Sequence, residues 1–452
     1  MNSTTHPAGA SESPGLAESG TPKASTSGRD TAATAVFKLA EVASRLLFLL
    51  STLLLLDPKS AGQFGLLNTL VALFSLFVGF ERWGVLWRKL SNIGADECGA
   101  LIANTLKFFQ FNYLIWSPVF VAMAYFWIKL SWFEITLGLC IAICEQLAVG
   151  AYWLATVNGQ YRWLILITAA KNFAMLATLG VLLFGFSHII TLTVALKIWA
   201  IAGFISVLTF AILRSGRHSI HLKFTGEQIG EITDQYRESR THFLTGLAAF
   251  SSGQIDRIVV GTAVGLSLTG LYFKNLFIAA SVYSAATIFL HNRVVRKIYI
   301  EAGQRRYDVA LSITRRESAK AFAIYVSMIL LVLFFGQQSI IVSILNKYSI
   351  SWIYLVGLLI ALFLRTLADY NCTILNAAGY DKWILAIHTS SISISAVLIF
   401  FLTRSFGVVG AVVAMMVGCS VLLILSEVCR KRVLSDKDVR LPRPVALSTD
   451  DA

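Results

Sequence analysis

This chain contains a row of about twelve apolar stretches, each long enough to cross a lipid bilayer as a helix. The hydrocarbon core of a bilayer is about 30 Å thick, which takes about 20 residues of helix. The chain is 56% hydrophobic and only 14% charged, whereas soluble domains carry about 25% charged residues. We therefore predict an all-α polytopic membrane protein. The expected spans are 33–56, 64–83, 101–128, 133–157, 163–186, 189–213, 242–264, 272–290, 319–345, 352–377, 383–402 and 407–428.

The basic residues collect in every second gap between these stretches. The opposite gaps hold only Lys59, Lys129, Lys347 and Arg404. Short cytoplasmic loops of membrane proteins retain arginine and lysine, so this bias predicts that both termini are cytoplasmic. The basic gaps and the C-terminal tail contain Arg82, Arg88, Lys89, Arg162, Arg214, Arg217, Lys223, Arg237, Arg240, Arg293, Arg296, Lys297, Arg305, Arg306, Arg315, Arg316, Arg430, Lys431 and Arg432.

Composition along the chain suggests five segments. Residues 1–30 are rich in Ser, Thr, Ala and Gly, which predicts a disordered cytoplasmic tail with no cleavable signal. Two six-helix lobes follow at 31–213 and 242–430, joined by a cytoplasmic linker at 214–241. Residues 431–452 form a second cytoplasmic tail.

The two lobes carry matching landmarks. Gly62, Phe64, Arg88 and Lys89 match Gly270, Tyr272, Arg296 and Lys297 at one constant offset, and Gly159, Arg162 and Trp163 match Gly379, Lys382 and Trp383 at a second offset. Six spans in each lobe give both repeats the same orientation. This predicts a pseudo-two-fold axis along the membrane normal, with a substrate site near the midplane where the lobes meet.

Several other classes of protein do not fit the sequence. The net charge of +13 lies in short loops rather than in a separate basic domain, so we expect no nucleic-acid partner. No gap is long enough for a folded catalytic domain, and no GxxxxGK[ST] phosphate loop is present, so we expect neither an enzyme nor a bound cofactor. His218 and His221 alone do not make a metal site.

Charged residues inside the spans are candidates for function, because each is costly in a bilayer unless it faces a partner or a cavity. Lys38, Glu41 and Arg45 lie on one face of the first span, and Arg365 and Asp369 share a face of the tenth. Asp256 and Arg257 are adjacent in the seventh span. Glu145 aligns with Arg365 between the repeats, and Arg45 aligns with Arg257 if one short gap is allowed.

Taken alone, Lys107, Lys197 and Lys274 are best explained as lysines whose ammonium groups extend to the membrane surface. Two further interpretations of the charges stay open. They form structural ion pairs, or they line a cavity that receives an anionic group, which the excess of cations favours because the planar fork of arginine suits phosphate. On the second interpretation the substrate-binding candidates are Arg45, Lys38, Arg257, Lys171, Arg365 and Lys274, and the candidates for ion coupling are Glu145, Asp256, Asp369 and Glu41.

Short motifs along the whole chain after the tail resemble the polysaccharide (O-antigen, Wzx-type) flippases of the multidrug/oligosaccharidyl-lipid/polysaccharide exporter superfamily. Lys274 departs from the pattern, since a small residue is expected there. The motifs are Ser44-Arg45, Asp57-Pro58, Gly62-Gln63-Phe64-Gly65, Ile255-Asp256-Arg257, Gly270-Leu271-Tyr272, Asn376-Ala377-Ala378-Gly379-Tyr380 and Phe406-Gly407-Val408-Val409-Gly410-Ala411.

The resemblance implies two lobes that alternate access of a central cavity to the two sides of a bacterial inner membrane. The expected substrate is a polyprenyl-diphosphate-linked oligosaccharide, a precursor of lipopolysaccharide or exopolysaccharide. Membrane lipids are the expected surroundings. The expected protein partners are a polysaccharide polymerase and assembly proteins.

Three alternatives remain. A cation-coupled drug or small-solute antiporter of the same superfamily would need an acidic cavity. A membrane-embedded glycan polymerase or ligase would need a large outer loop. A scaffold that transports nothing would not need a dozen charges inside its spans.

Overall fold

The structure is a computed structural model that describes residues 28–82, 86, 95–157, 161–186, 189–214, 228–304 and 306–435, and the regular structure in these ranges is helical. The first half contains α1 (Gly28–Leu55), α2 (Pro58–Gly79), α4 (Ala95–Ala122), η1 (Met123–Trp127), α5 (Trp132–Val157), α6 (Tyr161–Phe186) and α7 (Leu192–Arg214). The second half contains α8 (Gln228–Ala263), α9 (Leu266–Ala286), η3 (Thr287–His291), α10 (Asn292–Gly303), α11 (Tyr307–Phe335), α12 (Ser339–Lys347), α13 (Trp352–Ala377) and α14 (Asp381–Ser435).

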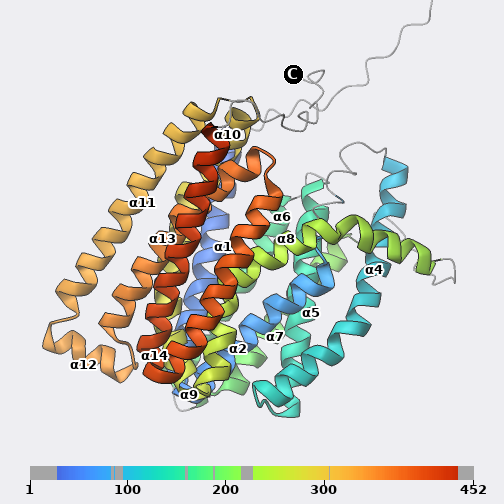
Figure 1. The fold of residues 1–452 in the computed structure, drawn as a ribbon. Coiled ribbons are helices and arrows are strands. Elements are labelled where there is room, and N and C mark those ends of the chain that lie inside the picture. The colour runs from blue at the N-terminus through green and yellow to red at the C-terminus, as the bar shows by residue number, and fades with distance from the viewer. Residues whose placement is uncertain are drawn as a thin grey trace, which may run out of the picture.

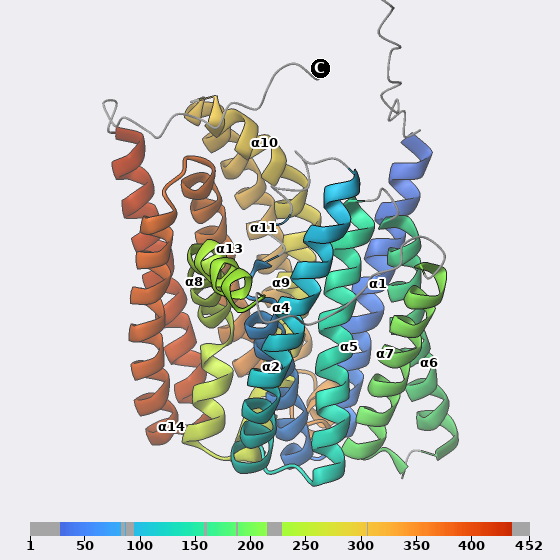
Figure 2. The same cartoon turned by 90° about the vertical axis from the view of Figure 1, so that its right-hand side faces the viewer.

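The helices form two lobes that lie side by side (Figures 1 and 2). In the N-terminal lobe, α1 packs on α6, α5 packs on α7, and α2 packs on α4 and α5. In the C-terminal lobe, α14 packs on α8 and α13, while α11 packs on α13. The lobes meet mainly where α2 packs on α9. The expected fold of two six-helix lobes is confirmed.

The contact between α2 and α9 follows the predicted repeat. A Cβ atom on Gly62 would lie 2.1 Å from the carbonyl oxygen of Leu266, and one on Gly270 would lie 1.8 Å from that of Pro58. Pro58 and Leu266 are separated by the same offset as Gly62 and Gly270. Only glycine permits backbones to approach this closely, so the two matching landmarks form one two-fold contact.

Twelve crossing helices account for the lobes. Seven helices among the described residues are long and apolar enough to cross a membrane by length and composition alone. One of these, α14, holds two crossings joined at Gly407, whose φ of 59° favours glycine. The other crossing helices, α1, α4, α8 and α9, carry charged or polar side chains along their length. Candidates for the functional site lie on α1, α8 and α9, and also on the more apolar α5, α6 and α13.

Local sequence sets several helix ends. Asp57 caps α2 by accepting hydrogen bonds from the backbone nitrogens of Lys59 (3.0 Å) and Ser60 (3.2 Å), and Pro58 begins the helix where its missing N–H has no partner to lose. The expected span 319–345 is wrong at both ends. It is α11, which begins at Tyr307 and ends before Gly336, followed by the separate short helix α12.

The expected linker 214–241 is also partly helical. Residues 215–227 lie outside the described residues, but α8 already begins at Gln228. Its polar first turns pack on the N-terminal lobe, where Glu238 forms an ion pair of 2.7 Å with the buried Arg82, and the Phe243 ring stacks 3.9 Å from that of Phe80. The expected tail 1–30 lies outside the described residues up to position 27, and the expected tail 431–452 lies outside them from position 436 onward.

Candidate functional site

A cavity of about 300 Å³ lies inside the C-terminal lobe between α8, α9, α13 and α14. Both Arg257 and Arg365 line it, together with the amide of Gln254 and the hydroxyl-bearing ring of Tyr283. Its other lining residues are Ala249, Phe250, Gly253, Asp256, Leu276, Ala280, Ser284, Leu362 and Met415. Most of this wall is apolar, so the two guanidinium groups are its strongest polar features.

Arg365 is held in place by two neighbouring helices. Its Nη1 donates a hydrogen bond of 2.6 Å to the backbone oxygen of Ser252 in α8, and its guanidinium carbon lies 5.9 Å from the ring centroid of Tyr283 in α9. Gly253 leaves room for this arrangement, because a Cβ there would lie 3.1 Å from the Arg365 Nη2. The arginine is therefore fixed at the wall of the cavity.

Arg257 has unused hydrogen-bonding capacity. Its Nε is buried and has no hydrogen-bond partner among the residues that the structure describes, and the same holds for the Oε1 of Gln254. The guanidinium carbon of Arg257 lies 5.4 Å from the ring centroid of Phe277. Buried polar atoms are normally paired, so Arg257 is a cavity residue whose hydrogen bonds are incomplete in this structure.

The acidic residues beside these arginines bind tyrosine hydroxyls. Tyr272 donates a hydrogen bond of 2.5 Å to Asp256, and Tyr283 donates one of 2.7 Å to Asp369. The sequence pattern had placed Asp369 and Arg365 on one helix face, and the structure sets the Tyr283 ring beside both of them. Each carboxylate thus lies next to an arginine of the cavity and accepts a hydrogen bond from a tyrosine hydroxyl.

A second cluster of charges joins four helices of the N-terminal lobe. Glu145 in α5 accepts hydrogen bonds from Lys171 in α6 (2.8 Å) and from the indole Nε1 of Trp199 in α7 (2.9 Å). Arg45 in α1 lies 3.6 Å from the other carboxylate oxygen of Glu145, and its side chain is 46% exposed. The cluster holds two cations and one anion, so it keeps a net positive charge.

The remaining candidates of the first span form a pair close to this cluster along α1. The ammonium of Lys38 lies 2.8 Å from the carboxylate of Glu41, and the backbone oxygen of Glu41 accepts a hydrogen bond of 3.1 Å from Asn172 in α6. The helical face predicted for Lys38, Glu41 and Arg45 thus packs toward α6.

Several sequence expectations differ from the structure. The cavity lies inside the C-terminal lobe rather than where the lobes meet, and Arg45, Lys38 and Lys171 do not line it. Glu145 and Arg365 do not pair, because the hydrogen bonds and ion pairs of each lie within its own lobe. Lys274 does not line the cavity; it is buried and donates a hydrogen bond of 2.9 Å to the backbone oxygen of Leu56, just after α1 ends. A cation suits the carbonyl end of a helix, so Lys274 anchors the turn between α1 and α2.

The aromatic and amide partners of the charges are not evident from the sequence. Trp199, Tyr272 and Tyr283 each donate to a carboxylate from within an apolar stretch, and Gln254 lines the cavity. In the sequence, Tyr272 stands out as a repeat landmark opposite Phe64 and as part of the motif Gly270-Leu271-Tyr272. The signal available in the sequence is the presence of tyrosine and tryptophan inside spans of a protein that also has acidic residues inside its spans.

Comparison with known proteins shows which solved structures share this fold. No family model matches the sequence, and no curated protein matches it. The structure is similar to an inward-facing multidrug resistance MATE family transporter of the MOP superfamily, with a TM-score of 0.67 and 12% identity over 89% of this chain and 98% of that one. It is also similar to the lipid II flippase MurJ in an inward closed conformation, with a TM-score of 0.63 and 14% identity over 88% of this chain and 87% of that one.

A third similar structure is a MOP superfamily transporter from Pyrococcus furiosus, for which reverse polarity of the binding pocket suggests a different function (TM-score 0.50, 12% identity, 89% of this chain and 94% of that one). At these identities the likeness shows the fold. The chain has the two-lobe, twelve-helix fold of the MOP-superfamily transporters, and its apolar helices make it a multi-pass membrane protein.

Proposed function

We propose that this protein flips a polyprenyl-diphosphate-linked oligosaccharide from the cytoplasmic to the outer leaflet of a bacterial inner membrane by alternating access. The observation that carries the proposal is the pair Arg257 and Arg365 at the wall of one cavity, with the Nε of Arg257 buried and unpaired among the described residues. Arginine presents a planar fork of donors that matches the oxygens of a diphosphate.

The charge balance of the cavity favours an anionic substrate over a cationic drug. Asp256 is the acidic residue among the lining residues, and its carboxylate already accepts a hydrogen bond from Tyr272. A drug-cation antiporter of the same fold would need an acidic site with free carboxylate oxygens. The runner-up function, cation-coupled antiport of a drug or small solute, is therefore less well supported than lipid-linked glycan transport.

The proposed movement uses the two lobes and the bilayer together. The glycan and diphosphate pass through the protein while the polyprenyl chain stays in lipid. A membrane potential that is negative inside favours outward movement of an anion by about 2.3 kcal/mol per charge per 100 mV. The potential thus acts in the direction of export.

Proton binding would change the affinity of the cavity for the diphosphate. Asp256 and Asp369 lie next to the cavity arginines, so protonating either would increase the positive charge offered to the diphosphate. Ligand and proton would then strengthen each other's binding. Glu145 is a weaker candidate, because a proton there would leave both Lys171 and Arg45 without their counter-ion.

The proposal is tested in a strain that lacks the gene. We expect the lipid-linked oligosaccharide to accumulate in the inner leaflet and the surface glycan to disappear, with both restored by the wild-type protein. Normal surface glycan together with a changed sensitivity to cationic drugs would support the antiporter function instead.

A further inference from the structure

A second cavity opens on the outer edge of the N-terminal lobe, in a groove between α6 and α7. Its volume is about 490 Å³, within the range of about 300–1,000 Å³ that is usual for ligand pockets. Figure 2 shows these two helices at the margin of the lobe, away from the C-terminal lobe. The groove is lined by Ile167, Ala170, Lys171, Ala174, Met175, Thr178, Val194, Lys197, Ile198, Ile201, Ala202, Ile205, Ser206 and Thr209.

Small side chains make the groove. Ala170 and Ala174 on α6 lie opposite the wall of α7 that contains Ala202, and a methyl group at each position leaves space that a leucine would fill. The side chains of Ala170, Ala174 and Ile201 are exposed, so the groove opens to the surroundings of the helices. In a membrane-spanning lobe these surroundings are lipid chains, so a long apolar groove here suits a hydrocarbon chain.

Two lysines give the groove a charge. Lys171 lines its inner wall and Lys197 lines it near the beginning of α7, where the ammonium lies 5.3 Å from the ring centroid of Phe133. Among the described residues that line the groove, none is acidic. Ammonium groups beside an apolar channel are complementary to a lipid that carries phosphate.

Lys171 also connects the groove to the interior of the lobe. Its Nζ lies 2.8 Å from Glu145, whose other oxygen lies 3.6 Å from Arg45. Arg45 is on α1, which packs on α6 and also contacts α9 of the other lobe. A chain of charged groups therefore leads from the membrane-facing groove toward the interface of the lobes.

We infer that the groove between α6 and α7 binds the polyprenyl chain as the lipid enters the protein, with Lys197 placed to contact its phosphates before they reach the cavity of Arg257 and Arg365. This inference rests on the proposed function. A lipid-linked substrate needs a polar path for its headgroup and an apolar binding site, open to the membrane, for its chain. The groove is an apolar binding site next to the N-terminal cluster of Arg45, Glu145 and Lys171.

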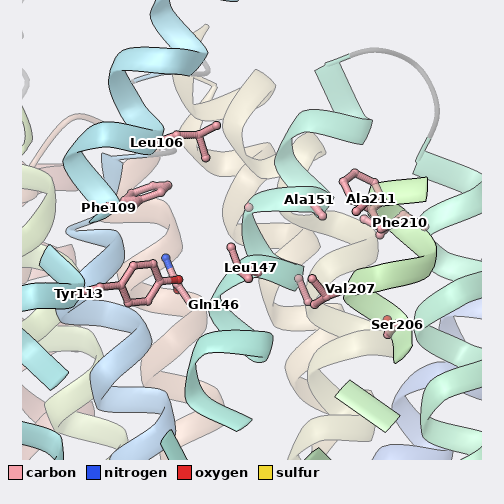
Figure 3. Close-up of a pocket in the computed structure, with 13 residues that line it drawn as sticks. Leu106, Phe109, Tyr113, Gln146, Leu147, Ala151, Ser206, Val207, Phe210 and Ala211 are labelled. Carbon is pink, nitrogen blue, oxygen red and sulfur yellow. The ribbon is translucent and has the colours of Figure 1, made fainter. Parts of the chain in front are cut away.

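Another apolar pocket is less suited to this role. It lies between α4, α5 and α7 and has a volume of about 160 Å³; Figure 3 shows Phe109 and Tyr113 of α4 across from Leu147 of α5 and Val207 of α7. Among the described residues that line it, none is charged. Nothing there would recognise a phosphate, so any lipid chain would fit it equally well.

Photocrosslinking tests the inference on the full-length protein in phosphatidylcholine nanodiscs. The probes are a diazirine-bearing polyprenyl diphosphate and the matching polyprenol without phosphate, and crosslinked positions are mapped by mass spectrometry. We expect the diphosphate probe to label α6 and α7 several-fold more than the alcohol does. Ala174→Phe, which fills the groove, should remove most of this labelling.

Ala177→Phe is the matched control, since Ala177 is also an exposed alanine of α6 but does not line the groove. If Ala174→Phe fails to fold, Lys197→Gln replaces it and should reduce labelling by the diphosphate probe alone. Equal labelling by both probes overturns the inference, as does strong diphosphate labelling elsewhere that Ala174→Phe leaves unchanged. If strong diphosphate labelling occurs elsewhere, the proposed function stands and only the groove inference is lost. If the diphosphate probe labels no site specifically, both the groove inference and the proposed function are contradicted.

Discussion

The carboxylate of Glu145 lies 2.8 Å from the ammonium of Lys171, and the two residues connect α5 to α6 inside the N-terminal lobe. Their side chains are only 12% and 6% exposed. Removing one member of a buried ion pair typically costs about 3–5 kcal/mol, because the other charge stays buried without compensation. We expect Glu145→Gln to lower the unfolding temperature of the purified protein markedly, and Glu145→Gln combined with Lys171→Met to recover much of that loss.

The same pair predicts which charge exchange restores transport. Glu145→Lys with Lys171→Glu should recover part of the activity that each single change loses, because the attraction returns with its sign reversed. Glu145→Arg with Arg365→Glu should recover nothing, since these residues have their partners in different lobes. Rescue in the second exchange and none in the first would contradict the arrangement of charges described above. Transport per amount of protein in the membrane is the quantity to compare.

The close approach of α2 and α9 predicts a strong effect at Gly62. In Gly62→Ala the added Cβ would lie 2.1 Å from a backbone oxygen, so the two helices must separate. Overpacking of this kind costs about 1–3 kcal/mol. Thermal unfolding should show a lower midpoint for Gly62→Ala and for Gly270→Ala. Gly180→Ala is the control, because a Cβ there meets no atom within 4 Å, and an equal loss at Gly180 would contradict the account.

The ion pair of Arg82 and Glu238 predicts a local effect at the contact of α8 with the N-terminal lobe. The Arg82 side chain is only 2% exposed, so Glu238→Gln leaves a buried cation without its partner. Hydrogen exchange of backbone amides in residues 228–243 should become faster. Asp234→Asn provides the comparison, since its pair with Arg237 is 3.9 Å long and largely exposed on the same helix. Equal acceleration in both variants would show that the buried pair does not hold α8 in place.

The basic bias predicts which end of the molecule faces the cytoplasm. Single cysteines at Lys59, Lys129 and Lys347 should react with an impermeant maleimide added to intact cells, while single cysteines at Gln304 and Lys382 should not. The native cysteines are first replaced. Figure 1 shows α12 and α10 at opposite ends of the bundle, as this pattern requires. Reversed labelling at two or more positions would mean that the chain is inserted the other way round.

Hydropathy and landmark spacing predicted the fold well. The thickness of the bilayer sets the length of each apolar stretch, and the orientation of the helices sets which loops are basic, so both are visible in the sequence. The offset of Gly62 and Gly270 even marked a contact between the lobes. Helix ends in polar segments were harder to predict. The helix α8 begins at Gln228, well before the apolar span, and its polar first turns are stabilised by tertiary contacts such as the ion pair of Glu238 with Arg82.

The partners of the charged residues were the least predictable part. Glu145 and Arg365 occupy matching places in the two repeats, but their partners differ. Glu145 accepts hydrogen bonds from Lys171 of α6 and Trp199 of α7, whereas Arg365 donates one to a backbone oxygen of α8. Lys274 resembled the other intramembrane cations but reaches the carbonyl of Leu56. Which charge meets which partner depends on helix rotation and packing, and a single sequence does not record either.

The most direct test of the proposed function measures flipping by the purified protein in liposomes that contain a fluorescent polyprenyl-diphosphate oligosaccharide. Arg257→Ala and Arg365→Ala should each abolish flipping, and Arg257→Lys and Arg365→Lys should restore only part of it, since lysine keeps the charge but lacks the fork. Arg404→Ala is the control, because Arg404 is exposed and does not line the cavity. Wild-type flipping by both alanine variants at the cavity, in folded protein, would contradict the claim that these arginines receive the diphosphate.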